Sequence, residues 1–107
     1  MYRFFTALVF FSSTTVLAND PVVVGQKDKA FTVSEVSIKV GDTVRFVNED
    51  SFFHNVFSLS DAALFDLGSF PKGEHRDIQF DTAGEVEVEC AIHPSMRMVI
   101  HVEEPEG

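Results

Sequence analysis

A chain of 107 residues can bury one hydrophobic core but is too short for two independent domains. Hydrophobic residues make up 45% of it and charged residues 23%, a balance typical of a globular protein and not of a disordered one. The 17 acidic residues outnumber the 8 basic ones, so nucleic acid and anionic membranes are poor partners, and a basic surface on another protein is a better one.

Residues 1–18 have the pattern of a secretory signal peptide. Arg3 supplies a positive charge, the run that ends at Leu17 is apolar, and the small residue Ala18 suits a cleavage site. The apolar run is too short and too rich in Ser and Thr to favour a membrane-spanning helix. We therefore expect a mature domain of residues 19–107 that is secreted to a periplasm and does not insert into the membrane.

After the signal peptide, apolar and polar residues alternate with the two-residue period of half-buried β-strands. Turn residues such as Gly41 and Asp42 separate these runs. The predicted strands cover residues 22–24, 31–40, 43–47, 54–58, 78–80, 86–90 and 98–102.

Residues 60–65 are the one segment that predicts a helix, of a turn or two at most, with Ser60 or Asp61 as its N-cap. Pro71 and Gly73 then favour a turn. Many short strands between turns predict an all-β fold, an antiparallel sandwich or barrel, with at most one short helix.

The single cysteine lies in a short segment that also carries a histidine and a methionine. Cys90 and His93 are three residues apart, as are His93 and Met96, so a tight turn can bring them to one ion. Pro94 stiffens that loop, and His54, at the start of a predicted strand, can add a second imidazole. Two imidazoles, a thiolate and a weak thioether are the ligands of a mononuclear copper site that transfers electrons.

Three other interpretations of these residues compete with copper. A lone cysteine is more often a small core residue, but a free thiol beside His93 and Met96 in an oxidising compartment needs a reason. A Cys–His pair can be a nucleophilic dyad, yet the sequence shows neither an oxyanion hole nor a helix that begins at Cys90. Zinc could bind the cysteine and the histidines, but Met96 would then have no role as a ligand.

The chain resembles the cupredoxins, the small type 1 blue copper proteins, and most closely their amicyanin, pseudoazurin and plastocyanin branch. Residues 41–48, 50–56 and 83–96 carry the resemblance, which covers nearly all of the mature domain. It implies a Greek-key β-sandwich that holds one copper ion, cycling between Cu(I) and Cu(II). It also implies an electron carrier whose redox partners dock near His93. We expect a monomer that is not an enzyme, because a site closed by four ligands leaves no position for a substrate.

Carried over residue by residue, the resemblance assigns His54, Cys90, His93 and Met96 as the copper ligands. It also gives Asn55 the task of steadying the cysteine loop.

Met98 is the alternative to Met96 as the axial ligand, because its spacing of five from His93 occurs in plastocyanin and pseudoazurin. We favour Met96, since its spacing of three matches the compact amicyanin-like loop. Met98 falls in register with the apolar residues of the last predicted strand, which makes it look like a core residue.

The other two histidines are predicted to be exposed, His75 in a charged turn and His101 on the outer face of the last strand.

The alternative function is copper binding for tolerance or delivery. Such proteins often carry Met-rich or His-rich tails, and residues 19–29 have neither, which favours electron transfer.

Overall fold

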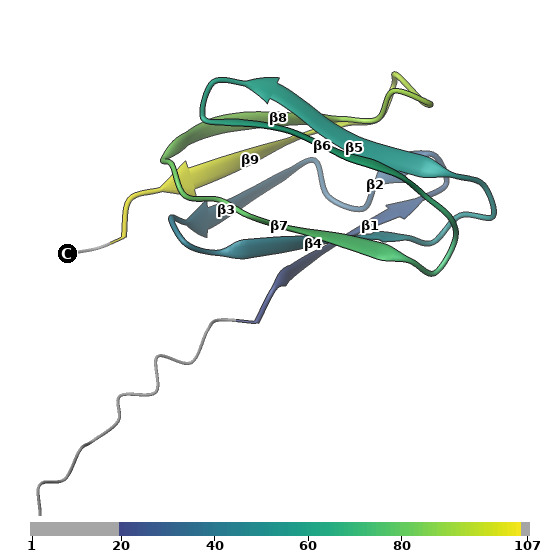
Figure 1. The fold of residues 1–107 in the computed structure, drawn as a ribbon, viewed down its shortest axis with the longest axis horizontal. Helices are drawn as coiled ribbons and strands as arrows, with labels where there is room; N and C mark the ends of the chain where they lie inside the picture. The colour runs from purple at the N-terminus through teal and green to yellow at the C-terminus, as the bar shows by residue number, and fades with distance from the viewer. Residues whose placement is uncertain (1–19, 106–107) are drawn as a thin grey trace, which may run out of the picture.

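Residues 20–105 are described by the computed structural model, and they form two β-sheets that pack face to face (Figure 1). The predicted signal peptide lies outside the described residues. In chain order the described strands are β1 (Val22–Lys27), β2 (Ala30–Phe31), β3 (Glu35–Lys39), β4 (Thr43–Asn48), β5 (His54–Ser60), β6 (Ala63–Phe70), β7 (His75–Gln79), β8 (Gly84–Glu89) and β9 (Arg97–Glu103).

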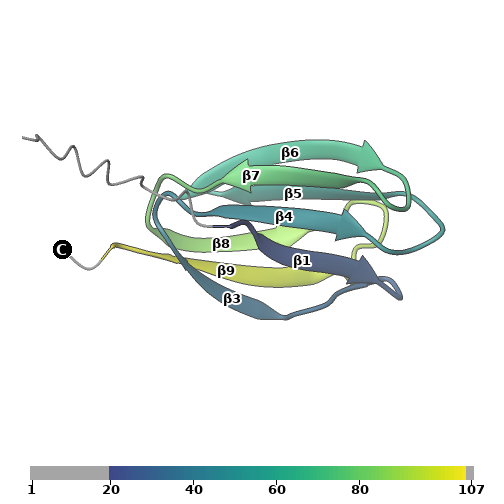
Figure 2. The same ribbon diagram turned by 90° about the horizontal axis from the view of Figure 1, so that it is seen from below.

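One sheet has the strand order β2-β1-β4-β7 and the other the order β3-β9-β8-β5-β6 (Figure 2). The predicted all-β, Greek-key sandwich is confirmed, but the sheets are not purely antiparallel, since β1 pairs with β4 and β3 pairs with β9 in parallel. In both pairs the chain visits the other sheet before it returns. Residue periodicity predicts a strand but not its neighbour, so the parallel pairs could not be foreseen.

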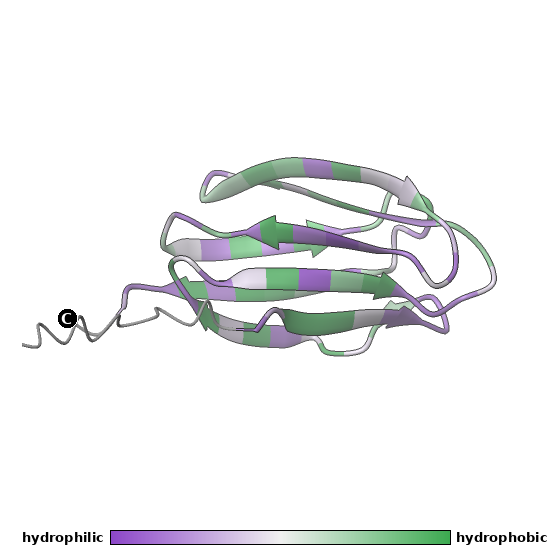
Figure 3. Ribbon diagram, turned by 60° about the horizontal axis from the view of Figure 1, so that its bottom comes forward, coloured by the Kyte–Doolittle hydropathy of each residue, from purple (hydrophilic) through white to green (hydrophobic). Residues whose placement is uncertain are grey.

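The alternation that predicted the strands also builds the core, as the changing colours along each strand show (Figure 3). On β8, Val86 and Val88 are fully buried, whereas Glu85 and Glu87 face solvent. Burying apolar side chains from both sheets is the main stabilising term of such a fold. The buried apolar residues are Val24, Phe31, Ile38, Val44, Phe46, Val56, Phe70, Phe80, Val86, Val88, Cys90, Met96, Met98, Ile100 and Val102.

The single strand predicted over residues 31–40 is divided in two. β2 ends at Phe31 and belongs to the four-stranded sheet, while β3 starts at Glu35 and belongs to the other sheet. The chain crosses between the sheets at residues 32–34, which interrupts the strand although the apolar alternation continues through it.

The short helix predicted at residues 60–65 is wrong. β5 continues to Ser60, a two-residue turn follows, and β6 starts at Ala63. The Ser60 hydroxyl, predicted as the N-cap, instead accepts a hydrogen bond from the backbone N–H of Glu87 on β8 at 2.9 Å. Pairing with neighbouring strands therefore outweighs the weak local helix signals.

The strand order brings the predicted metal ligands to one end of the five-stranded sheet. β5 begins at His54, and β8, its antiparallel neighbour, ends at Glu89. The loop of residues 90–96 therefore starts beside the first residues of β5 and leads into β9. None of the described residues forms a helix that is long and apolar enough to cross a membrane.

Candidate metal centre

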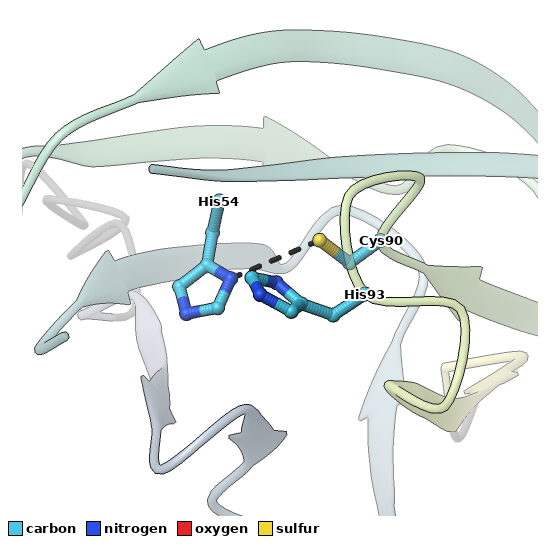
Figure 4. A group of neighbouring side chains, drawn as sticks. All are labelled: His54, Cys90 and His93. Carbon is cyan, nitrogen blue, oxygen red and sulfur yellow. Dashed lines mark hydrogen bonds between the residues drawn. The ribbon is translucent and has the colours of Figure 1, made fainter. Parts of the chain in front are cut away.

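Three of the four predicted ligands lie together at this end of the sheet (Figure 4). His54 comes from β5, whereas Cys90 and His93 come from the loop between β8 and β9. One ligand atom from each of these residues lies within 4.8 Å of the other two. Nδ1 of His54 is 3.8 Å from Sγ of Cys90, and both side chains are almost completely buried.

The nitrogen atoms of the site indicate that these residues suit a metal ion. Nδ1 of His93 is buried, and within residues 20–105 it has no hydrogen-bond partner. A buried polar atom without a partner is rare and destabilising, so its position calls for a ligand. Two imidazole nitrogens and a thiol that converge in this way match the donor set that copper prefers.

The loop that carries Cys90 and His93 is held by two short hydrogen bonds. The backbone N–H of Met96 donates to the carbonyl of His93 at 2.8 Å, which closes a tight turn around Pro94. The backbone N–H of Ala91 donates to Oδ1 of Asn55 at 2.7 Å. The second bond confirms the prediction that Asn55 steadies the cysteine loop.

Both candidate axial ligands are buried, with 1% of each side chain exposed. Met98 lies within β9, opposite Val88 on β8, and the prediction that it is a core strand residue is confirmed. Met96 lies in the loop just before β9, beside His93 in the closed turn. Its role as a copper ligand stays a prediction.

Asp50 contacts the site but was not predicted to do so. Its Oδ2 lies 2.7 Å from Nε2 of His54, and only 8% of Asp50 is exposed. Burial alone would raise the pKa of Asp50, but the hydrogen bonds with His54 and with two backbone amides outweigh burial and hold that pKa below its usual value. In the sequence, only the spacing of four residues between Asp50 and His54 could have indicated this contact. That spacing is equally compatible with a loop in which Asp50 faces solvent.

Phe52 is the second residue of the site that the sequence did not indicate. Its ring centroid lies 5.2 Å from that of His54 and 5.1 Å from that of His93, and the two imidazole centroids are 4.9 Å apart. Phe52 therefore contacts both imidazoles and limits the orientations that they can adopt.

Asn48 shapes the loop that presents Asp50 and Phe52. Its Nδ2 donates to the carbonyl of Phe52 at 2.8 Å and to that of Phe70 at 2.9 Å. Its Oδ1 accepts a hydrogen bond from the backbone N–H of Asp50 at 2.8 Å. One fully buried side chain thus satisfies three backbone groups next to the first ligand.

Neither of the other histidines joins the cluster. His75 is exposed, as predicted, but it begins β7 and does not lie in the turn. His101 is partly exposed on the outer face of β9, where its Nε2 lies 3.3 Å from a carboxylate oxygen of Glu35.

Comparisons with known proteins agree with this site. The family model of the copper-binding proteins of the plastocyanin/azurin family matches residues 18–103. Amicyanin from Paracoccus denitrificans is 34% identical over 92 residues, which cover 81% of this chain and 69% of that protein.

Two solved structures illustrate the shared fold. The crystal structure of amicyanin from Paracoccus versutus has a TM-score of 0.72 and 34% identity, and the match covers 78% of this chain and 82% of that one. A Cu-containing nitrite reductase from Thermus scotoductus SA-01 has a TM-score of 0.74 and 33% identity. This match covers 80% of the present chain but only 23% of the reductase, so this chain is similar to one part of that enzyme.

These findings confirm the predicted resemblance to the cupredoxins and the predicted copper cofactor. The chain belongs to the plastocyanin/azurin family of copper-binding proteins.

Proposed function

We propose that this protein carries single electrons between redox proteins by means of one copper ion held by His54, Cys90, His93 and Met96. The observation that carries the proposal is the convergence of three of these ligands, with a buried nitrogen of His93 that has no partner in the described part of the chain. When bound, copper supplies a one-electron couple, and a site of two imidazoles, a thiolate and a weak thioether suits both of its oxidation states.

Met96 is the axial ligand in this proposal. It lies in the same closed turn as His93, whereas Met98 lies within β9, in register with Val88 on β8. A site closed by four protein ligands has no open position for a substrate, in contrast to catalytic metal sites. We therefore assign the protein a role as a carrier and not as an enzyme.

The redox partner docks, in this proposal, where the site comes closest to solvent. His93 is only half-buried, and its neighbour Ile92 is 47% exposed. Phe53, next to the other histidine ligand, is 54% exposed. Apolar side chains at the centre of a small surface suit a transient complex, and the acidic chain favours a partner with basic residues around that centre.

The proposed cellular location is the periplasm. The signal-peptide pattern of residues 1–18 supports export. An exported protein with one free cysteine is also best explained by a thiol that serves a bound metal.

The optical spectrum of the copper-loaded protein tests this function. An intense visible band from charge transfer between the Cys90 thiolate and copper is expected, and it should vanish in Cys90→Ser. Reversible one-electron reduction of the coloured protein should follow. A colourless protein that binds Cu(I) tightly but is not oxidised reversibly would contradict electron transfer and favour copper handling.

A further inference from the structure

The turn between β1 and β2 lies next to the first ligand, although more than twenty residues separate the two in the chain. Asp28 and Lys29 form this turn, and Lys27 pairs with Ala30 on either side of it. Both turn residues have positive φ angles, 53° and 59°. Two-residue hairpins of this kind normally use Asn-Gly, because side chains other than Gly and Asn are strained there.

The carboxylate of Asp50 binds this turn. The backbone N–H of Asp28 donates to Oδ1 at 2.8 Å, and the backbone N–H of Lys29 donates to Oδ2 at 3.1 Å. Oδ2 is also the atom that lies 2.7 Å from Nε2 of His54. The carboxylate therefore links a strained turn of one sheet to a histidine of the other.

Each oxygen of the Asp50 carboxylate accepts a hydrogen bond from a backbone amide of the turn, so the carboxylate is held as an acceptor toward the imidazole as well. Nε2 of His54 must then carry the imidazole proton, which leaves Nδ1, the nitrogen near Cys90, with a free lone pair.

We propose that Asp50 is a positioning residue for His54, and that the amides of Asp28 and Lys29 hold its carboxylate in place. The carboxylate selects the imidazole tautomer that can bind a metal through Nδ1, and it fixes the direction of the ring. This inference rests on the proposed function only in taking His54 as a ligand. Carboxylates that bind the second nitrogen of a ligand histidine also make that histidine a stronger donor.

A second contact from the same turn supports the proposal. The ammonium group of Lys29 lies 5.7 Å from the ring centroid of Phe52, the residue that contacts both His54 and His93. The turn therefore reaches the two imidazoles by two routes, through Asp50 and through Phe52.

NMR of the metal-free protein, with ¹⁵N-labelled histidine, is the first test. The imidazole shifts of His54 should report a proton on Nε2 in the wild type and a mixture of tautomers in Asp50→Asn. A proton on Nδ1 in the wild type would overturn the proposal, whether or not the variant folds. This readout does not depend on copper, so it fails or succeeds separately from electron transfer.

Metal affinity is the second test. In Asp50→Asn, affinity for Cu(II) should fall about 10- to 100-fold and affinity for Cu(I) should fall less, so the reduction potential should rise.

The matched control is Asp28→Asn, which keeps the backbone amide that binds Asp50 and suits the positive φ angle at this position. It should leave the tautomer and both affinities unchanged. If Asp50→Asn loses stability but keeps the wild-type tautomer and the ratio of the two affinities, Asp50 only anchors the turn and the proposal is wrong.

Discussion

Replacement of Asn48 by Ala should destabilise the protein substantially. The change removes three hydrogen bonds, to the backbone groups of Asp50, Phe52 and Phe70. A typical hydrogen bond contributes about 1 kcal/mol net, so the loss should be about 3 kcal/mol, and more if the freed backbone groups stay buried. In a domain of this size each kcal/mol lowers the melting temperature by roughly 4–8 °C.

Urea and thermal unfolding of the metal-free protein measure this loss. Gln79→Ala is the matched control, because Gln79 is an exposed amide whose Nε2 donates to the carbonyl of Gly41 at 3.0 Å. The control should change the free energy of unfolding by about 0.5 kcal/mol or less. If Asn48→Ala costs no more than Gln79→Ala, Asn48 does not organise the loop as described.

Three further substitutions test other parts of the structure. Met96→Leu should shift the spectrum and potential of the copper protein, whereas Met98→Leu should leave both nearly unchanged; the opposite pattern would make Met98 the axial ligand. Asp77→Asn should reduce the loss of stability on acidification, measured by urea unfolding at pH 7 and pH 3. The hydrogen bond from Arg45 lowers the pKa of Asp77. The carboxylate therefore stabilises the fold above its unfolded pKa of about 3.9, and this stabilisation is lost as the pH falls through its folded pKa. Equal losses of stability in the wild type and in Asp77→Asn would contradict this. Ile92→Asp should slow electron exchange with a basic c-type cytochrome several-fold without changing the spectrum, and an unchanged rate would place docking elsewhere.

The sequence could predict the candidate ligands because most of the geometry that joins them is local. Cys90 and His93 are three residues apart, and the closed turn from His93 to Met96 needs only short-range contacts. His54 could be assigned because it begins a strand, and the resemblance to the cupredoxins then paired that strand with the loop.

The parts that could not be predicted depend on contacts between distant segments. From the sequence, Asp50 has the features of an ordinary loop residue. Its role becomes visible only in the structure, where the backbone amides of Asp28 and Lys29 donate to its carboxylate. The failed helix has the same cause, since the capping hydroxyl of Ser60 finds its partner on β8. Local propensity carries no information about such partners.

The two sides of the site are held differently, and this separates metal binding from partner recognition. His54 is fully buried and is held by Asp50 and Phe52, whereas His93 is half-buried beside the exposed Ile92. Changes on the buried side should therefore alter metal affinity and potential, and changes on the exposed side should alter rates with a partner. Because the two effects use different contacts, they should combine independently in the double variant Asp50→Asn/Ile92→Asp. Its Cu(II) affinity should equal that of Asp50→Asn, and a further loss of affinity caused by Ile92→Asp would show that the rim also supports the metal ligands.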